Sequence, residues 1–542
     1  MTLGRAPEQA DIWQSSVKYC EGKLSPTSVY RLLHAECHRL FPDDMFADLY
    51  EEVGRRSVPP RIVAVVMVLQ RIECLSDREA VDRFAFDVRW KYAAGGLDIE
   101  YPTFVHTVLV DMRARLRGSK DPDRIFNAVL DVAKEAGMVG RKRVLDSTPL
   151  YDAVATQDTV TMIRSAIRGV LRVADEGVAR EVRAVLKRDD DYATAGKPAC
   201  DWDDKTAREA LIDALARDAH AVLVLLHGRT LADGLREAAG LLATVVGQDL
   251  EQTKDGCFRI AHRVAPDRII STVDPEARHG HKTAARGFDG YKGHIAMDPD
   301  SEFITCAGVT PGNVGDAAVA KKLLEDVIPI APTSPSSGAS APDPSPAAEP
   351  TASTPVEVFG DASYGTGEML EHLEKAGAIA NVKVQPASAP GGRFTKDLFE
   401  IDLAKDTVTC PAGQLVQIRR REDGSGVASF GAACSACPMA EKCTASDAGR
   451  IVNVSVHERL LQAARTRQRD RAWRATYRAT RPKVERKLAH LVRRRHGGRR
   501  ARVRGVERVG QDFGMLCAAV NLNRLAARGW RSARPTQAEA AN

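Results

Sequence analysis

The sequence predicts a mixed α/β fold in which a helical N-terminal block precedes a sheet with helices on its faces. Residues 1–135 carry apolar side chains at helical three-to-four spacing, as in RIVAVVMVLQRI. Short segments rich in β-branched and aromatic residues then alternate with helical segments, which is the pattern of a mixed sheet. A chain of 542 residues is long enough for roughly three or four compact units.

The helical block of residues 1–135 is the first expected domain. Ser76 opens a capping box that starts a helix at Asp77, and Pro102 and Thr103 are expected to open the helix TFVHTVLVDMRARL. That helix ends in three arginines, Arg113, Arg115 and Arg117. The block is either a helix-turn-helix-like DNA-binding domain or a plain helical scaffold, because no recognition-helix pattern decides between them.

Residues 140–158 and 250–405 are expected to form the sheet. RKRVLDSTPL predicts a short strand that ends near Asp146, and VEVFGDASYG predicts another with Asp361 near its end. Further strands are expected at RIISTVD, GYKGHIAMD, FITCAGVTPG and AIANVKVQP. DAAVAKKLLEDVI predicts a helix, as does TGEMLEHLEKAG with Gly377 as its stop. Ligands on such sheets gather at strand ends, which draws attention to the two aspartates.

Other segments interrupt or follow this sheet. Residues 159–247 predict a helical insertion that packs on itself, and the Pro/Ser/Ala-rich residues 331–355 predict a disordered surface loop. Residues 406–450 form an irregular cysteine-rich insert, and residues 457–530 a basic helical C-terminal part of the core that carries Glu485.

Charge is distributed unevenly along the chain. The net charge is only +6, but residues 459–504 hold eighteen Lys or Arg against two acids. Trp473 and Tyr477 are interleaved with these charges, so the segment has a packed side and a basic side rather than only a solvated face. This density predicts binding to a phosphate backbone that weakens steeply with salt.

The remaining composition excludes several classes. The longest apolar run, which starts at Ile62, is too short to span a bilayer, and no signal peptide is recognisable. A soluble, intracellular protein is therefore expected. ATP dependence has no support, since no GxxxxGK[ST] phosphate loop occurs.

Asp146, Asp361 and Glu485 are the candidate catalytic residues. Cleavage of a phosphodiester needs an activated water and a stabilised leaving oxygen, and two divalent cations held by carboxylates can supply both. Taken singly, each aspartate would be a turn or cap residue, and Glu485 half of a helix-surface ion pair. Only their joint occurrence favours one metal site.

The order of motifs along the chain resembles the DDE transposases of bacterial insertion sequences, which have an RNase H-like catalytic core. The motifs that carry the resemblance are SDREAVDRF, LDST, STVDPEARHGHK, GFDGYKGH, TPGNVGDA, GDASYG, CSACPMAEKC, RPKVERKLAHL, GGRRARVRG and AAVNLNRL. The resemblance implies a catalytic triad of Asp146, Asp361 and Glu485 that binds two Mg²⁺ or Mn²⁺ ions. It also implies double-stranded DNA as partner, both terminal inverted repeats and target DNA, and a homodimer or larger assembly on DNA. The implied location is the bacterial cytoplasm, in association with the nucleoid.

The C-terminal helix resembles the signature Tyr-x2-Arg-x3-Glu-x6-Lys of these enzymes. Arg481 and Glu485 fit its spacing, whereas Arg478 and Val492 stand at the Tyr and Lys positions. A helix start or kink is expected at Pro482, with a buried stripe formed by Val484, Leu488 and Leu491. The expected DNA contacts are Arg478, Arg481, Lys483, Arg493, Arg494, Arg495, Lys282 and Lys292.

Four clustered cysteines have the spacing C-x23-C-x2-C-x5-C. Cys410, Cys434, Cys437 and Cys443 suggest a structural zinc site with no open coordination position, and free thiols are the alternative.

Three histidines lie in or shortly before the expected strand GYKGHIAMD. His279, His281 and His294, with Lys282, suggest a DNA-contacting loop more than a metal site. Asp274 and Glu276 are either outer acids of the active site or caps of a turn around Pro275.

The sequence thus predicts a DNA transposase that cleaves element ends and transfers the strands. A catalytically inactive DNA-binding regulator and a metal-dependent nuclease without strand transfer share this fold, and both readings stay open.

Overall fold

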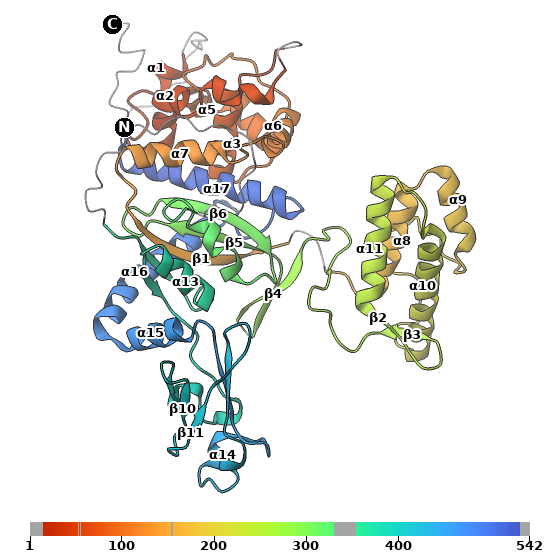
Figure 1. Cartoon of the computed structure of the whole chain (residues 1–542). Helices are drawn as coiled ribbons and strands as arrows, with labels where there is room; N and C mark the ends of the chain where they lie inside the picture. The colour runs from red at the N-terminus through yellow and green to blue at the C-terminus, as the bar shows by residue number, and fades with distance from the viewer. Residues whose placement is uncertain are drawn as a thin grey trace, which may run out of the picture.

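The fold is that of a computed structural model, which describes residues 15–51, 54, 56–152, 156–283, 285–329 and 354–531. The loop predicted to be disordered, residues 331–355, lies outside these residues except for its last two. A mixed sheet occupies the centre, with the N-terminal helices on one side of it and two smaller units projecting from it (Figure 1).

The N-terminal block is helical, as the spacing of apolar residues predicted. Its helices are α1 (Ser16–Cys20), α2 (Val29–Leu40), α3 (Pro60–Glu73), α4 (Asp77–Phe86), α5 (Val88–Ala93), α6 (Thr107–Arg117) and α7 (Arg124–Glu135). The capping box at Ser76 is confirmed by both of its hydrogen bonds with Glu79. The predicted start of α6 at Thr103 is wrong, because Phe104 turns into the core against Phe84 before the helix begins.

The central sheet combines antiparallel and parallel strands. Its members are β1 (Lys142–Tyr151), β4 (Arg278–Thr283), β5 (Arg286–Met297), β6 (Ile304–Pro311), β7 (Glu357–Gly360) and β8 (Ile379–Val382). The path runs β4-β5-β1-β7-β8, and β6 pairs with β5 beside β4. β5 is antiparallel to β1, β4 and β6, whereas β7 is parallel to β1 and β8.

The strand β1 is longer than predicted, so Asp146 lies in its middle and not at its end. Its pairing with β7 stops at Val144, but its pairing with β5 continues to Tyr151. Between Val144 and Tyr151 the strand therefore has a paired strand on one side only, so Pro149 is tolerated without a lost ladder hydrogen bond.

Three further predictions about this region are wrong. RIISTVD forms no strand apart from a single bridge at Ile269, and the expected loop RHGHKT is strand β4. The helix expected at DAAVAKKLLEDVI is reduced to a 3-10 turn (Asp316–Val319) and the short α12 (Ala320–Leu323). The next helix, α13 (Gly367–Lys375), ends as predicted before Gly377, whose φ is 64°.

The helical insertion packs on itself. It contains α8 (Thr159–Val173), α9 (Glu176–Val185), α10 (Lys205–Leu226), α11 (Asp233–Asp249) and the hairpin of β2 (Leu250–Gln252) and β3 (Phe258–Ile260). Its buried side chains form a hydrophobic cluster of their own. The unit stands beside the sheet, on the far side of β4 (Figure 1).

The cysteine-bearing segment is more regular than predicted. It forms one sheet of β9 (Glu400–Asp402), β10 (Thr407–Thr409) and β11 (Leu415–Gln417), and another of β12 (Arg419–Arg420), β13 (Gly426–Ser429) and β14 (Ile451–Val454). The short helix α14 (Ala440–Cys443) lies between β13 and β14 in sequence, and a small apolar cluster joins the two sheets.

The C-terminal helices are α15 (Glu458–Arg469), α16 (Arg471–Leu491) and α17 (Val506–Ala527). Of the helix start or kink expected at Pro482, the start is wrong, because α16 begins at Arg471 and runs through the proline. Tyr477 and Arg481 are buried before and beside the proline, which fixes the first half of the helix in place. The predicted stripe of Val484, Leu488 and Leu491 is confirmed as buried.

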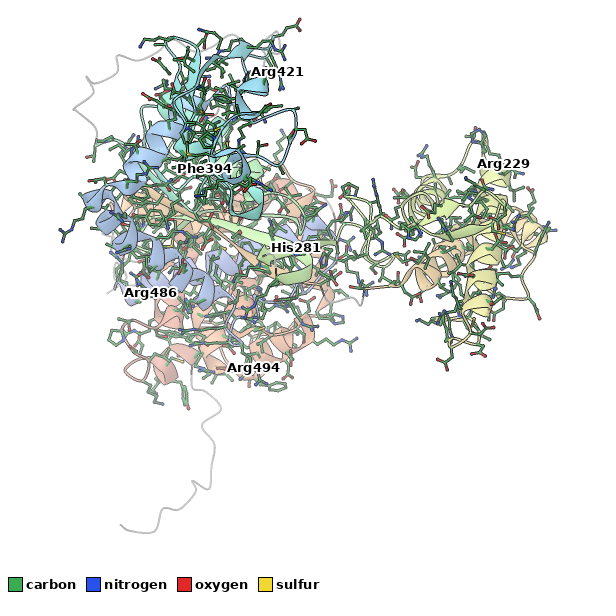
Figure 2. All side chains as sticks on the ribbon, turned by 90° about the horizontal axis from the view of Figure 1, so that it is seen from below. Arg229, His281, Phe394, Arg421, Arg486 and Arg494 are labelled. Atoms are coloured by element: carbon green, nitrogen blue, oxygen red, sulfur yellow. The ribbon has the colours of Figure 1, made fainter. Side chains whose placement is uncertain are left out.

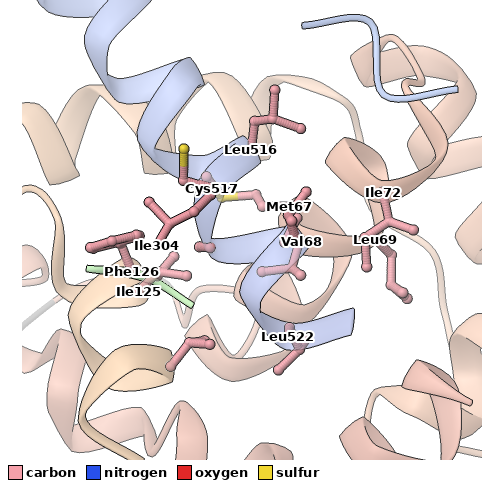
Figure 3. Close-up of a cluster of buried hydrophobic side chains, with 14 of the residues drawn as sticks. Met67, Val68, Leu69, Ile72, Ile125, Phe126, Ile304, Leu516, Cys517 and Leu522 are labelled. Atoms are coloured by element: carbon pink, nitrogen blue, oxygen red, sulfur yellow. The ribbon is translucent and has the colours of Figure 1, made fainter. Parts of the chain in front are cut away.

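Helix α17 joins the N-terminal block to the sheet. Its Leu516, Cys517 and Leu522 pack in one cluster with α3, α7 and Ile304 of β6 (Figure 3). The N-terminal helices and the C-terminal part of the chain therefore share one hydrophobic core. Within the described ranges, no helix is both long and apolar enough to cross a membrane.

Asn521, the first asparagine of the VNLNRL motif, forms hydrogen bonds with the backbone of β6. Its side-chain oxygen accepts from the Ile304 N–H (2.9 Å) and its amide donates to the Ile304 carbonyl (2.7 Å), both buried. Asn521→Leu should leave both backbone groups unpaired, at about 1–3 kcal/mol for each. Urea unfolding measures the loss. Asn523→Leu, two residues on and outside this contact, should change stability by no more than about 0.5 kcal/mol; equal losses in the two variants would contradict the assignment.

His496, in the turn after α16, is expected to make the stability of the protein depend on pH in the acid range. The ring of His496 lies 3.2 Å from the carbonyl of Ile72 and 3.2 Å from the ring of His490. Burial, reinforced by the charge of His490, lowers the pKa of His496 to about 4. The unfolded chain takes up a proton near pH 6.5 and the folded chain only near pH 4, so stability present above pH 6.5 is lost as the pH falls between these values.

His496→Gln should therefore flatten this loss by about 2 kcal/mol, once solvent screening is allowed for. Chemical unfolding at a series of pH values from 7 to 4 measures it. His38→Gln, at an exposed position of α2, should leave the profile of the parent protein unchanged. A His496→Gln profile that parallels the parent would remove His496 as the cause.

Candidate functional site

The register of the central strands brings Asp146 and Asp361 side by side. β1 and β7 run parallel, and their last paired residues are Val144 and Phe359. Each aspartate lies two residues beyond this pair, on neighbouring strands whose axes are about 4.8 Å apart. Residues 215 positions apart in sequence therefore meet at one edge of the pairing.

Gly365 keeps the turn after Asp361 tight. A Cβ at this position would lie 1.8 Å from the carbonyl oxygen of Lys383, so no other residue fits without moving the backbone. Ser363 N–H also donates to the Asp361 carboxylate at 2.9 Å. The GDASYG motif thus fixes the backbone that carries Asp361.

Arg481 of α16 binds all three candidate acids. Its guanidinium donates to both oxygens of Asp146, at 2.8 and 2.9 Å. It lies 3.7 Å from Asp361 and 3.9 Å from Glu485, which stands one helical turn further along α16. The three acids expected from sequence are therefore gathered around one buried cation.

The acids differ in exposure, and this decides how each is held. The side chain of Asp146 is 12% exposed, that of Asp361 41% and that of Glu485 63%. Burial raises the pKa of Asp146, and the hydrogen bond and charge of Arg481 oppose this rise. Burial works against the charge of Arg481, yet the bonds to Asp146 keep the pKa of Arg481 above its usual range.

Two tyrosines line the protein side of this cluster, and neither was singled out in the sequence as a site residue. Tyr477 Oη donates to the carbonyl of Gly360 at 3.1 Å, which ties α16 to the end of β7. Burial raises the pKa of Tyr477 to about 12. Tyr364 is fully buried, and burial together with Asp316, Asp146 and Asp361 raises its pKa. Both hydroxyls therefore stay protonated beside the carboxylates.

A fourth acid, Asp316, lies behind the three and was missed in the sequence. It accepts from Ser147 Oγ at 2.8 Å and pairs with Lys292 at 3.1 Å. It follows the TPGNVG turn, and that motif was the only signal that could have found it. Lys292, expected to contact DNA, is thus engaged with Asp316 and the Val314 carbonyl.

The three acids open onto one pocket with a basic rim. Asp146, Asp361, Arg481 and Glu485 line it together with Lys282, Arg286 and Arg499. A pocket with carboxylates at its floor and cations at its edge suits a phosphate backbone better than an acidic or apolar ligand.

The other expected DNA contacts are not among the residues that line this pocket. Arg478, Arg493, Arg494 and Arg495 are exposed, whereas Lys483 pairs with Asp300 at 3.2 Å. In Figure 2, Arg486 and Arg494 mark the basic C-terminal region, at the opposite end of the view from Arg421 of the cysteine-bearing unit.

The histidines and neighbouring acids of the second strand group have structural partners. His279 pairs with Asp289 at 2.7 Å, and His294 is buried against Thr310 at 2.9 Å. Burial lowers the pKa of His294 to about 4. The exposed His281 and Lys282 lie in β4.

Asp274 and Glu276 belong to the start of α17 rather than to the acidic site. Asp274 accepts from the hydroxyl of Tyr291 at 2.6 Å, and Glu276 accepts from the N–H of Val506 at 2.8 Å. The Ala277 N–H donates to the Asp274 carbonyl, which closes the expected turn around Pro275.

The arginines at the end of α6 are also engaged inside the fold. Arg113 pairs with Asp77, Arg117 donates to Gln511 of α17, and Arg115 lies over the ring of Tyr50. These contacts favour a scaffold for this part of the N-terminal block.

The chemistry of the carboxylate cluster fits a hard divalent cation, because its donors are oxygens at the edge of an open pocket. The acids are arranged around Arg481 rather than around a common centre. Among the described residues, no group of three or more His, Cys, Asp or Glu side chains is arranged to hold a metal ion.

The four clustered cysteines line one small cavity of the cysteine-bearing unit. None of the four is in a disulfide, and Cys434 and Cys437 are joined by a turn in which the Cys437 N–H donates to the Cys434 carbonyl. The Arg450 N–H donates to the sulfur of Cys434 at 3.4 Å. Sulfur ligands would suit zinc. These cysteines too are not arranged, within the described part of the chain, as a group of three or more side chains that holds a metal ion.

Comparison with known protein families identifies the chain. Residues 409–526 match the family described as transposase DDE domain, and residues 21–115 match the transposase domain (DUF772). No curated protein and no solved structure matches. The first match contains the Glu485 helix and the cysteine cluster, and the second contains most of the N-terminal helical block. Together the two matched segments indicate an insertion-sequence DDE transposase.

Proposed function

We propose that the protein cleaves DNA at the ends of its element and transfers the strands into target DNA, with Asp146, Asp361 and Glu485 as the catalytic acids. The observation that carries this proposal is their assembly around Arg481 at the floor of a basic-rimmed pocket. Transposases act on DNA, and the exposed arginines of α16 and the turn after it supply the charge for that.

The fold supports an RNase H-like core for this site. Three antiparallel strands, β6, β5 and β1, are followed by the parallel strands β7 and β8. α16 then crosses the sheet beside β1 and β7, which brings Glu485 to the two aspartates. The helical insertion and the cysteine-bearing unit leave this order intact.

The three acids would hold Mg²⁺ or Mn²⁺, which would activate a water and stabilise the leaving oxygen of the phosphodiester. The side chains of the protein position the DNA and offset charge. Arg481 offsets part of the negative charge of the three carboxylates and holds α16 against the sheet. Lys282, Arg286 and Arg499 at the rim would orient the DNA backbone.

Asp361→Ala tests the site. The variant should lose cleavage of a labelled element end in Mg²⁺ while its DNA binding stays within about twofold, since Asp361 contributes no positive charge to the DNA surface. Gel assays of cleavage and fluorescence anisotropy of binding measure the two effects. Glu368→Ala, an exposed acid seven residues further on and outside the pocket, should cleave like the parent. Cleavage by Asp361→Ala would show that the catalytic site lies elsewhere.

The same assay separates the two alternative functions. A nuclease would cut the element end without joining it to target DNA, and an inactive regulator would bind without cutting. Transfer of the labelled 3′ end into a target plasmid is the result expected of a transposase.

We further propose that Cys410, Cys434, Cys437 and Cys443 bind a structural zinc ion, which their common cavity supports. The purified protein should then contain about one zinc ion per chain, and Cys434→Ser should lose most of it. Elemental analysis measures the content. Cys257→Ser changes an exposed cysteine outside this cavity and should retain zinc. Unchanged zinc in Cys434→Ser would leave the free-thiol reading.

A further inference from the structure

A large pocket lies between the helical insertion and the core, away from the three acids. It is lined by α8, α9 and α11 of the insertion, by Thr272 to Pro275 of the segment that returns to the core, and by Arg504 before α17. Nothing in the proposed catalytic chemistry uses it.

Four arginines face this pocket from three parts of the chain. Arg168 and Arg172 come from α8, Arg183 from α9, and Arg504 from the core. Among the described residues, none of the four has an ion pair or a side-chain hydrogen bond. By contrast Arg164, one turn earlier on the same face of α8, is buried and bound to Asp190 at 2.7 Å. On this face of α8, Arg164 is therefore bound within the fold, whereas Arg168 and Arg172, which line the pocket, have no such partner.

The acids of the pocket do not neutralise these arginines. Asp191 is held by the N–H of Ala193 at 2.9 Å and pairs with Arg164 at 3.5 Å. Glu237 of α11 also lines the pocket, so the balance stays positive. Guanidinium groups spread over a wide opening suit several phosphates of a polymer better than one small anion.

A short basic segment connects this pocket to the three acids. Arg499 lines the acidic pocket and Arg504 the second one. The segment between them is anchored on β1, because the Tyr151 N–H donates to the Arg499 carbonyl and the Ala501 N–H to the Tyr151 carbonyl. At its other end, the N–H of Gly505 donates to Asp274.

The length of this segment limits how far apart the two pockets lie along DNA. Five residues span at most about 17 Å. A duplex rises about 3.4 Å per base pair, so this distance corresponds to at most about five base pairs.

We propose that the pocket between the helical insertion and Arg504 binds backbone phosphates of the same DNA duplex, within about five base pairs of the cleaved bond. This assigns the insertion a role as a DNA clamp, and it rests on the proposed function for the position of the cleaved bond. The contacts are to phosphates and carry no sequence preference.

The test measures the salt dependence of binding with the full chain carrying Asp361→Ala, so that DNA stays intact. The probe is a duplex with the element's terminal sequence. Adding Arg168→Gln and Arg172→Gln should lower the slope of log K against log salt by about 1.8, and Arg504→Gln alone by about 0.9. The matched control, Lys187→Gln with Lys254→Gln, removes two exposed charges of the insertion that lie outside the pocket, and should leave the slope unchanged.

Shortening the duplex stepwise from about five base pairs to none on the side of the second pocket should abolish the difference between variant and parent. Equal slopes in parent and arginine variants, or an equal fall in the lysine control, would overturn the proposal. The outcome is separate from cleavage: loss of slope without any cleavage by the protein with Asp361 intact would retain the DNA contact and reject the catalytic assignment.

Discussion

The ion pairs of Arg481 are the interaction on which the site depends. Three carboxylates within reach of one another repel, and burial adds to the cost for Asp146. One guanidinium that contacts all three offsets both effects and also holds α16 against β1 and β7. Cations that bind these acids would therefore share the role of Arg481, so the arginine and the acids form one electrostatic unit.

The architecture around this unit separates binding from support. The N-terminal helices and α17 share a core with β6, and the arginines at the end of α6 form contacts within that part of the fold. Exposed positive charge also lies on α16, on the turn after it and in the pocket of the insertion. The proposed DNA contacts therefore follow a surface that runs from the three acids toward the insertion. The N-terminal block packs against the sheet through the shared hydrophobic core.

Much of the fold could be predicted because its signals are local. The capping box at Ser76, the stop at Gly377 and the buried stripe of α16 depend on residues within a few positions of one another. Predictions failed where a distant contact decided the outcome. Phe104 leaves the helix to pack on Phe84, and β1 passes Pro149 because β5 continues beside it. α16 continues through Pro482 because Tyr477 and Arg481 are fixed by the sheet.

The motifs and their order along the chain single out the three acids without any coordinates. Their meeting depends on the tertiary structure, because the pairing of β1 with β7 joins residues 215 positions apart and no local pattern encodes that register. The structure also decided that Arg481 is buried among them, that Asp316 lies behind, and that Arg504 faces the insertion. The physical reason is the same in each case: local preferences set the elements, whereas burial and charge pairing between distant elements set the site.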